Sequence, residues 1–254
     1  MDVSGRVAIV TGGGTGVGRA TALDLAQRGC SVAINYSRSA AEAEETAAAV
    51  RKHGARAFAF QADVADDAAC RALVDATVRE LGRVDVLVQS AGVTAFIPHA
   101  NLDAVTSDDW QRILGVNLIG AFQMARAVRA PMDAAGAGMI VNVSSVAGIA
   151  GVGSSIPYCA SKAGMNNLTV TLARALAPKI RVVAVAPGFI TGRWLEGGLG
   201  GAYEPIKKAM EAKSPLGRVC DPSDVSDAIV ALITGSELVT GIVVPVEGGM
   251  LIAG

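Results

Sequence analysis

The chain has 254 residues, 51% of them hydrophobic, and its 22 Lys and Arg against 23 Asp and Glu give a formal charge of −1. This length fits one large α/β domain, and the apolar content favours a sizeable core over a disordered chain. The even charge balance lacks the basic footprint of a nucleic-acid-binding protein, so we expect no nucleic-acid partner.

Histidine and cysteine usage argues against a metal centre. The two histidines, His53 and His99, are isolated, and the four cysteines are widely spaced without a C-x-x-C pair. This pattern disfavours a zinc site and a Ser-His-Asp triad, and it fits reduced thiols. The apolar run at the N-terminus is too short for a signal peptide, and no stretch of ~18 apolar residues suggests a membrane span. We therefore expect no metal, no membrane association and a cytoplasmic location.

Short β-branched runs alternate along the chain with Ala-rich segments of helical spacing. We expect strands at 6–10, 31–35, 56–60, 84–88, 139–143, 180–185 and 241–246, and helices at 17–28, 40–53, 66–81, 107–130, 158–177 and 222–234. Near-continuous apolar runs are typical of strands buried on both faces, and the alternation predicts a parallel sheet with right-handed crossovers. The fold class is thus α/β, a Rossmann-type doubly wound fold whose mainly seven-stranded parallel sheet carries helices on both faces, in a single domain over 1–254.

Two segments stand out from this rhythm. The glycine-rich stretch TGGGTGVG, residues 11–18, follows the first strand and opens the first helix. Glycines there permit a tight turn and let the backbone approach a pyrophosphate at the positive end of a helix, which predicts a nucleotide site. The stretch at about 187–213 is Gly-rich and weakly periodic, and we expect it to be a substrate-covering loop.

The pentapeptide YCASK places Tyr158 and Lys162 four residues apart on an expected helix. Residues at this spacing lie on one helix face, roughly 5–6 Å apart at Cβ. A lysine cation so close favours the tyrosinate and should lower the phenol pKa from its ordinary ~10, so that the phenol can exchange a proton during catalysis.

Further motifs follow in order: ADV (62–64), QSAG (89–92), NLIG (117–120), NVSS (142–145), YCASK (158–162), Pro187-Gly188 and TGIVVPVEGG (240–249). Together with the glycine turn they resemble the classical short-chain dehydrogenase/reductase family over nearly the whole chain. The chain is similar to 3-oxoacyl-[acyl-carrier-protein] reductase-like and glucose dehydrogenase-like members.

The resemblance implies catalysis by Asn117, Ser145, Tyr158 and Lys162. Tyr158 would exchange the proton while hydride passes between a nicotinamide and a carbonyl carbon, and Ser145 would hold the substrate oxygen. Lys162 would tune Tyr158 and bind the nicotinamide ribose, and Asn117 would keep a water linking Lys162 to solvent. Ser144, the other serine of the motif, would pack or hydrogen-bond near the strand end.

The resemblance also implies a cofactor-binding set, in which Asp63 would bond the adenine amino group. That set comprises Gly12, Gly14, Thr15, Gly16, Val17, Gly18, Ser37, Arg38, Asp63, Val64, Ala91, Gly92, Tyr158, Lys162, Pro187, Gly188, Ile190 and Thr191.

Several residues depart from the family pattern. Gln89 and Ser90 replace two asparagines that brace the central sheet, and Glu247 replaces an aspartate near the C-terminus. Thr191 comes one residue early after Pro187-Gly188, which leaves open whether it contacts the cofactor's carboxamide or phosphate.

The end of the second strand bears on cofactor choice. Tyr36 stands where an NAD-selective member carries an acid, and Ser37 and Arg38 follow it. An arginine can engage a 2′-phosphate that an acid would repel, so NADP(H) is favoured, with NAD(H) possible.

The substrate is expected to be a small-molecule ketone or secondary alcohol, with a 3-oxoacyl-ACP or -CoA thioester as the alternative. Arg126, Arg129 and Arg174 are the candidate contacts for an acidic carrier protein. A catalytically silent nucleotide-binding regulatory protein is the alternative of another class. The family also implies a homotetramer.

The expected pocket wall is mostly apolar, which favours a neutral, moderately hydrophobic carbonyl compound over a charged keto acid. It comprises Phe96, Ile149, Val152, Ile156, Phe189, Trp194 and Leu195. Arg193 is the cation of the 187–213 segment that could reach into this pocket.

Overall fold

A computed structural model describes residues 1–253 of the chain. Its centre is a seven-stranded, wholly parallel sheet with strand order β3-β2-β1-β4-β5-β6-β7, which confirms the predicted fold class. The strands are β1 (Val7–Thr11), β2 (Ser31–Tyr36), β3 (Ala57–Gln61), β4 (Val86–Gln89), β5 (Gly138–Val143), β6 (Ile180–Pro187) and β7 (Val243–Val246).

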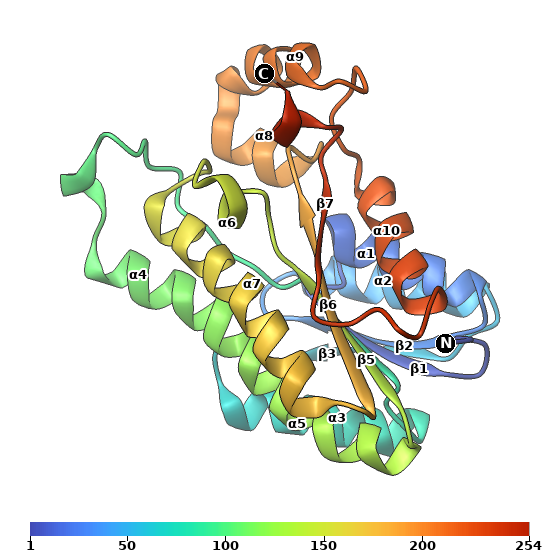
Figure 1. Ribbon diagram of the computed structural model, residues 1–254. Coiled ribbons are helices and arrows are strands. Elements are labelled where there is room, and N and C mark those ends of the chain that lie inside the picture. Colours follow the sequence, from blue (N-terminus) through green and yellow to red (C-terminus); the bar gives the residue numbers. More distant parts are fainter. Residues whose placement is uncertain (254) are drawn as a thin grey trace.

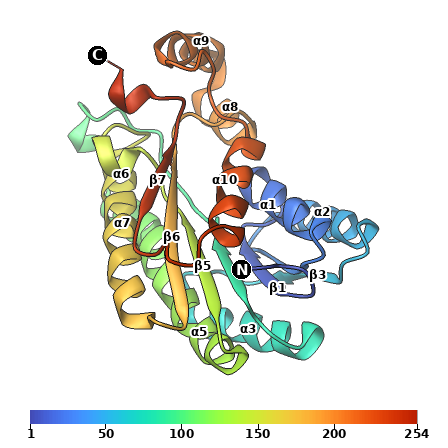
Figure 2. The ribbon, with the colours of Figure 1, turned by 45° about the vertical axis from the view of Figure 1, so that its right-hand side comes forward.

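Helices cover both faces of this sheet (Figure 1 and Figure 2). One layer holds α1 (Gly16–Gln27), α2 (Ala40–Lys52) and α10 (Pro222–Thr234), and the other holds α3 (Asp67–Leu81), α5 (Gly120–Ala135) and α7 (Ile156–Leu176). Leu25 and Ile229 are fully buried in the first layer, and Leu73 and Met124 in the second. Both faces of the sheet are therefore removed from water, as the continuous apolar strands predict.

Local side chains fix where the long helices begin. Asp66 accepts hydrogen bonds from the backbone N–H groups of Ala68 and Ala69 at the start of α3, at 2.8 and 3.2 Å. Ser155 does the same for the N–H of Tyr158 at 3.4 Å, at the start of α7. Each cap satisfies donors that the first helical turn leaves free.

The helix expected at 107–130 is interrupted. The structure has α4 (Ser107–Leu114), one π-helical turn (Gly115–Ile119) and then α5. Within that turn the Asn117 side chain is fully buried and bonds to the backbone of Val93, outside the helix. The hydrogen bonds between Asn117 and Val93 account for the wider turn. Such π-bulges inside helices often occur at functional sites.

The loop expected at 187–213 is mostly helical, so that prediction was wrong in its local structure. The segment contains α8 (Arg193–Leu199), a 3₁₀ turn (Gly200–Ala202) and α9 (Tyr203–Lys213). These helices stand above the carboxyl ends of the strands, close to the C-terminal residues (Figure 1). A further short helix, α6 (Ala147–Ala150), follows β5.

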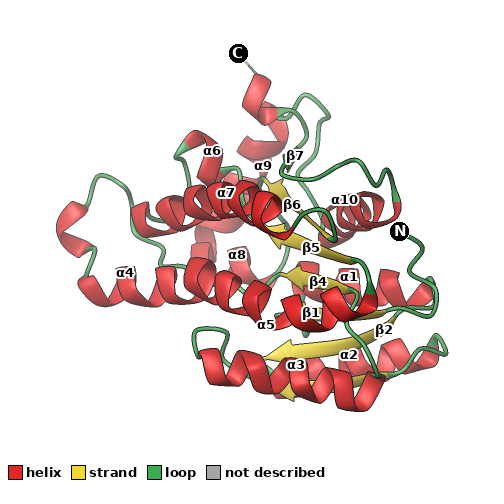
Figure 3. Ribbon diagram, turned by 60° about the horizontal axis from the view of Figure 1, so that its bottom comes forward, coloured by secondary structure: helices red, strands yellow, loops and turns green. Residues whose placement is uncertain are grey.

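Figure 3 shows the strands lying among the helices that pack on the sheet. Among residues 1–253, no helix is long and apolar enough to cross a membrane. Within the same residues, no group of three or more His, Cys, Asp or Glu side chains is placed to hold a metal ion. All four cysteines are free and buried.

Candidate active site

The predicted site residues meet at the carboxyl edge of the sheet, where strand order reverses between β1 and β4. Ligands of doubly wound folds bind in the crevice outside this switch point, because the connections leave the two strands in opposite directions. The glycine turn follows β1, Gly92 follows β4, Ser145 follows β5 and Gly188 follows β6. The topology therefore gathers motifs that are widely separated in sequence.

The glycine turn leaves no space for side chains at its tightest points. Gly12 has φ +62°, and a Cβ added there would lie 3.0 Å from Ala91 Cα. A Cβ at Gly14 would lie 3.0 Å from the backbone nitrogen of Ala43, and one at Gly18 would collide with the Gly12 carbonyl oxygen. Helix α1 begins at Gly16 and directs its free N–H groups into the same crevice. This cradle fits a dinucleotide pyrophosphate.

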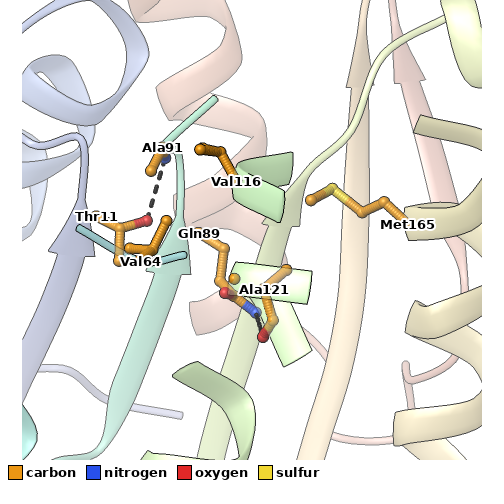
Figure 4. Close-up of a pocket in the computed structure, with 8 residues that line it drawn as sticks. Thr11, Val64, Gln89, Ala91, Val116, Ala121 and Met165 are labelled. Atoms are coloured by element: carbon orange, nitrogen blue, oxygen red, sulfur yellow. Dashed lines mark hydrogen bonds between the residues drawn. The ribbon is translucent and has the colours of Figure 1, made fainter. Parts of the chain in front are cut away.

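A small cavity of about 10 Å³ lies beside this turn (Figure 4). Its lining residues include Thr11, Val64, Ala91 and Val116. Thr11 Oγ1 accepts a hydrogen bond of 3.1 Å from the Ala91 N–H, which ties the end of β1 to the loop after β4. Sequence reasoning missed Val116, because it lies in an expected helix and its only signal is its place next to Asn117.

Gln89, which departs from the family pattern, braces the sheet. Its Nε2 donates to the carbonyl oxygen of Ala121 and to Asn142 Oδ1, both at 3.0 Å, and Figure 4 shows the first of these bonds. Asn142 Nδ2 in turn donates to Thr169 Oγ1 at 2.8 Å. The glutamine therefore links β4 to β5 and α5, and the buried amide groups are satisfied.

Asn117 holds the loop after β4. Its Oδ1 accepts from the Val93 N–H at 2.8 Å, and its Nδ2 donates to the Val93 carbonyl and to Ser161 Oγ, both at 3.0 Å. A Cβ at Gly92 would lie 3.6 Å from Asn117 Oδ1 and 3.9 Å from Lys162 Nζ. The structure thus brings Asn117, Gly92 and Lys162 together.

Ser145 and Tyr158 lie at the mouth of the same crevice. Ser145 Oγ accepts from the Ala147 N–H at 3.1 Å and lies 3.5 Å from the Pro187 carbonyl oxygen. Ser144 points elsewhere, since its hydroxyl bonds to Asn166 Oδ1 at 2.5 Å inside the fold. The choice of Ser145 over Ser144 agrees with this geometry, and Ser144 hydrogen-bonds near the strand end as expected.

Lys162 is buried, with 4% of its surface exposed. Its Nζ donates to the Val143 carbonyl oxygen at 2.8 Å and lies 5.7 Å from the centroid of the Tyr158 ring. A Cβ at Gly148 would lie 2.5 Å from the Lys162 carbonyl carbon, so glycine lets α6 pack against α7 at this point. The expected pairing on one helix face is confirmed.

The expected lowering of the tyrosine pKa is wrong for the chain by itself. Although part of the Tyr158 side chain stays exposed, burial raises its pKa to about 12, against which a hydrogen bond with Ser145 acts. Burial also lowers the pKa of Lys162 to about 8. The Lys162 ammonium hydrogen-bonds to the Val143 carbonyl oxygen, and burial outweighs the effects that lower the pKa of the phenol.

The 187–213 segment contacts Tyr158 and Phe96. The Trp194 ring meets the Tyr158 ring edge-on with centroids 6.4 Å apart. Phe96 packs so closely on Gly198 that any side chain there would overlap its ring. Trp194 and Phe96 thus lie close to other residues of the segment and of α7, while Trp194, Ile149 and Val152 are all exposed at their outer sides. Whether they line a substrate pocket stays a prediction.

Three polar residues near this segment have partners of their own. Arg193 forms an ion pair of 2.6 Å with Glu42. The Thr191 hydroxyl bonds to Asp221 at the start of α10, and its N–H donates to the Cys220 carbonyl at 2.8 Å. Glu247 accepts from the Gly249 and Leu251 N–H groups, so the substitution for aspartate serves to fold the chain after β7.

The residues proposed to face the adenosine are exposed at the far side of the crevice. Ser37 and Arg38 follow β2, and Asp63 follows β3. Asp63 Oδ1 accepts from the Ala65 N–H at 2.9 Å, while Gln61 donates to the Ser37 carbonyl at 3.1 Å. Arg38 carries no ion pair within residues 1–253, so its guanidinium is free for a ligand.

Comparison with known proteins gives a consistent result. The family model described as short chain dehydrogenase matches residues 6–196. A protein of Streptomyces violaceoruber that carries the name granaticin polyketide synthase ketoacyl reductase 2 is 42% identical over 96% of this chain and 95% of its own length. The cis-4-hydroxycyclohexanecarboxylate dehydrogenase of Sinomonas cyclohexanicum is 38% identical over 96% of each chain.

Solved structures agree with these relatives. Levodione reductase superposes with a TM-score of 0.91 at 30% identity, over 99% of each chain. NAD⁺-bound xylitol dehydrogenase has a TM-score of 0.89 at 33% identity, over 98% of this chain and 100% of its own. The chain therefore belongs to the short-chain dehydrogenase family, whose members are oxidoreductases of alcohols and carbonyl compounds.

Proposed function

We propose that the protein is an NADP(H)-dependent oxidoreductase that interconverts a neutral ketone and a secondary alcohol, with Tyr158 as the general acid and base. The observation that carries the proposal is the convergence of Ser145, Tyr158 and Lys162 beside the glycine turn. A catalytically silent nucleotide-binding regulator is the competing reading, and it is disfavoured because each of these side chains is present.

When bound, the nicotinamide cofactor supplies or accepts the hydride. Tyr158 keeps its proton at neutral pH because its pKa is about 12, so it can donate that proton to the substrate oxygen during ketone reduction. Ser145, held by the Ala147 N–H, offers its hydroxyl to the same oxygen. Alcohol oxidation is the reverse step, in which the Tyr158 phenolate takes the proton from the alcohol oxygen.

Lys162 has its proposed role at the cofactor, and Asn117 has its role at the loop after β4. The buried Lys162 ammonium next to Gly92 would give charge-assisted hydrogen bonds to the ribose hydroxyls of the cofactor. Asn117 fixes Val93, so it keeps the loop after β4 at the right distance from the crevice. Its role in holding a water beside Lys162 stays a prediction.

Cofactor preference gives the first test. Arg38 is exposed at the end of β2 and can bind a 2′-phosphate, which NADPH has and NADH lacks. We expect wild type to show a higher kcat/KM with NADPH, and Arg38→Ala to lower it about 10–100-fold for NADPH with little change for NADH. Lys52→Ala at the other end of α2 is the matched control. A wild-type preference for NADH would overturn this assignment.

The substrate class follows from the surface and the pocket wall. Arg126 pairs with Asp67 at 2.5 Å and Arg129 with Asp133 at 3.6 Å, so two cations that could meet an acyl carrier protein already have acidic partners. Relatives such as the 3-oxoacyl-[acyl-carrier-protein] reductase of Synechocystis, 37% identical over 98% of each chain, support the thioester alternative. We favour the free ketone or alcohol because Asp67 and Asp133 beside these arginines leave this surface without the concentrated positive charge that an acidic carrier protein would recognise.

Trp194 should set the shape of the pocket. Its ring lies against Tyr158, so it contacts a substrate group bound beside the reacting oxygen. We expect Trp194→Ala to raise KM for bulky ketones several-fold, about the worth of a buried aromatic contact, while kcat changes less. Steady-state kinetics with one bulky and one small ketone measure this, and equal losses with both would argue against a contact role.

The homotetramer is supported by an apolar groove between α5 and α7. It is lined by Leu118, Ile119, Phe122, Gly164, Asn167, Leu168 and Thr171. Ile119 is 51% and Phe122 43% exposed, and such contiguous apolar surface is typical of subunit contacts. We expect wild type to be tetrameric by light scattering at micromolar concentration and Phe122→Glu to dissociate it, whereas a monomeric wild type would contradict the assembly.

The cytoplasmic location we also propose is supported by the four free thiols.

A further inference from the structure

The ion pair between Arg193 and Glu42 joins segments 151 residues apart in the chain. Arg193 is the first residue of α8 in the covering segment, and Glu42 lies in the first turn of α2. Arg193 Nη1 is 2.6 Å from Glu42 Oε1. The pair therefore ties the cover over the crevice to the helix that follows β2, and it directs the Arg193 cation to α2.

The glycine turn lies directly against this pair. A Cβ on Gly14 would lie 3.0 Å from the Ala43 nitrogen and 3.3 Å from the Glu42 carbonyl carbon, so the backbones of Gly14 and of Glu42-Ala43 are in contact. Thr46, one turn along α2, donates to the Gly14 carbonyl oxygen at 3.3 Å. Arg193 is thus paired with a residue whose backbone touches the turn that fits a pyrophosphate.

Both side chains of the ion pair are exposed enough for an anionic ligand to replace Glu42 as the partner of Arg193. The Arg193 side chain is 61% exposed and that of Glu42 34%, and ion pairs at such exposure are weak and screened by salt. Gly192 before α8 has φ +118° and Gly200 after it has φ +52°, backbone conformations that favour glycine and leave both ends of the helix free of side chains. The hydrogen bond from Arg193 also lowers the pKa of Glu42, so this carboxylate stays charged.

We propose that Arg193 is a ligand of the pyrophosphate of the bound dinucleotide, and that Glu42 holds it in place when no dinucleotide is bound. This rests on the proposed function, since it needs a dinucleotide on the glycine turn. A pyrophosphate carries two negative charges against one on Glu42, and the planar arginine fork binds phosphate with two parallel hydrogen bonds. The exchange therefore favours the phosphate and makes the position of α8, and with it Trp194, depend on the cofactor.

The test is a fluorescence titration of NADPH and of NADH against the full-length protein, without substrate. Arg193→Ala should weaken both dinucleotides by the same factor, about 10-fold or more, and Arg193→Lys should recover part of the loss. Glu42→Gln should tighten both about 2–5-fold, because it removes the competing partner of Arg193. Glu45→Gln, on the same helix and 3.9 Å from Arg19, is the matched control and should change neither.

The double variant separates exchange from simple repulsion. In the Arg193→Ala background Glu42→Gln should no longer tighten binding, because there is no arginine left to release. Equal tightening in both backgrounds would show that Glu42 only repels the ligand, and a weakening by Glu42→Gln would show that the pair is a structural clamp. If Arg193→Ala weakened the binding of NADPH alone, Arg193 would contact the 2′-phosphate and not the pyrophosphate. Each of these three results overturns the proposal. Wild type that binds neither dinucleotide would instead sink the proposed function.

Discussion

Tyr158→Phe should lower kcat for ketone reduction by about 10²–10⁴-fold, the usual worth of a positioned general acid. The ring and its edge-on contact with Trp194 remain in this variant, so the loss reports the hydroxyl alone. NADPH affinity, measured by titration, should stay within a factor of about two, because the phenol is assigned to the substrate oxygen.

Tyr203→Phe provides the matched control. Tyr203 is buried in α9 and its ring packs on Phe189 at 5.8 Å between centroids, outside the proton-transfer site. That variant should keep nearly wild-type kcat. If Tyr158→Phe retained most of its turnover, or if both tyrosine variants lost it equally, Tyr158 would not be the proton donor.

Lys162→Met should lower kcat/KM for NADPH by about 10²-fold, the upper value for a charge-assisted hydrogen bond. The methionine side chain is close in length and apolar, so it suits a position that is already buried. The loss should appear as weaker NADPH binding as well as slower turnover, which separates this variant from Tyr158→Phe. Unchanged NADPH affinity would remove Lys162 from the cofactor site.

The pH dependence of Lys162 checks the same assignment. Burial lowers its pKa from 10.5 to about 8 in the folded chain, so the folded state resists protonation. Below about pH 8 this amine destabilises the fold, and the penalty is relieved as pH rises from about 8 to 10.5, where only the unfolded chain stays protonated. Urea unfolding should show wild type gaining stability relative to Lys162→Met over that window.

Enzyme activity should fall over the same pH range in which the stability of the fold rises. The charged ammonium binds the ribose, so kcat/KM for NADPH should fall above about pH 8 while Tyr158 remains protonated. A flat profile up to pH 10, together with unchanged relative stability, would contradict the buried, titrating lysine.

The sheet, and the gathering of the proposed catalytic residues at its carboxyl edge, could be predicted from the sequence because both depend on local patterns. Runs such as residues 180–185 are too apolar for anything but a strand buried on both faces. Ser145, Tyr158 and Lys162 lie at the ends of elements whose order fixes where they meet. The family pattern further selected Ser145 over Ser144, and the hydrogen bond between Ser144 and Asn166 agrees with that choice.

What the sequence could not predict depends on tertiary contacts. The π-turn around Asn117 has the same helical periodicity as its neighbours, and it is specified by Val93, which lies 24 residues earlier. Helix α8 was missed because Gly197 and Gly198 lower its helix propensity, and packing such as that of Phe96 on Gly198 offsets this. Helix α9 contains no glycine, and it was missed because it follows directly on this Gly-rich stretch.

Two electrostatic features were also beyond local patterns. The pKa of Tyr158 follows from how much of the fold surrounds its hydroxyl, whereas the i, i+4 spacing predicts only that a lysine is near. The ion pair of Arg193 with Glu42 joins positions that no local pattern relates, and it is the basis on which we propose Arg193 as a cofactor ligand instead of a substrate contact.

The most direct test of the proposed carbonyl reduction follows the transferred hydride itself. Wild type, a neutral hydrophobic ketone and NADPH deuterated at the reactive nicotinamide carbon are incubated together, and the alcohol product is analysed by mass spectrometry, with Tyr158→Phe run alongside. We expect one deuterium at the carbinol carbon with wild type, and product formation slowed about 10²–10⁴-fold in the variant. No deuterated alcohol from any member of a panel of ketones, with NADPH or NADH bound to the protein, would contradict it.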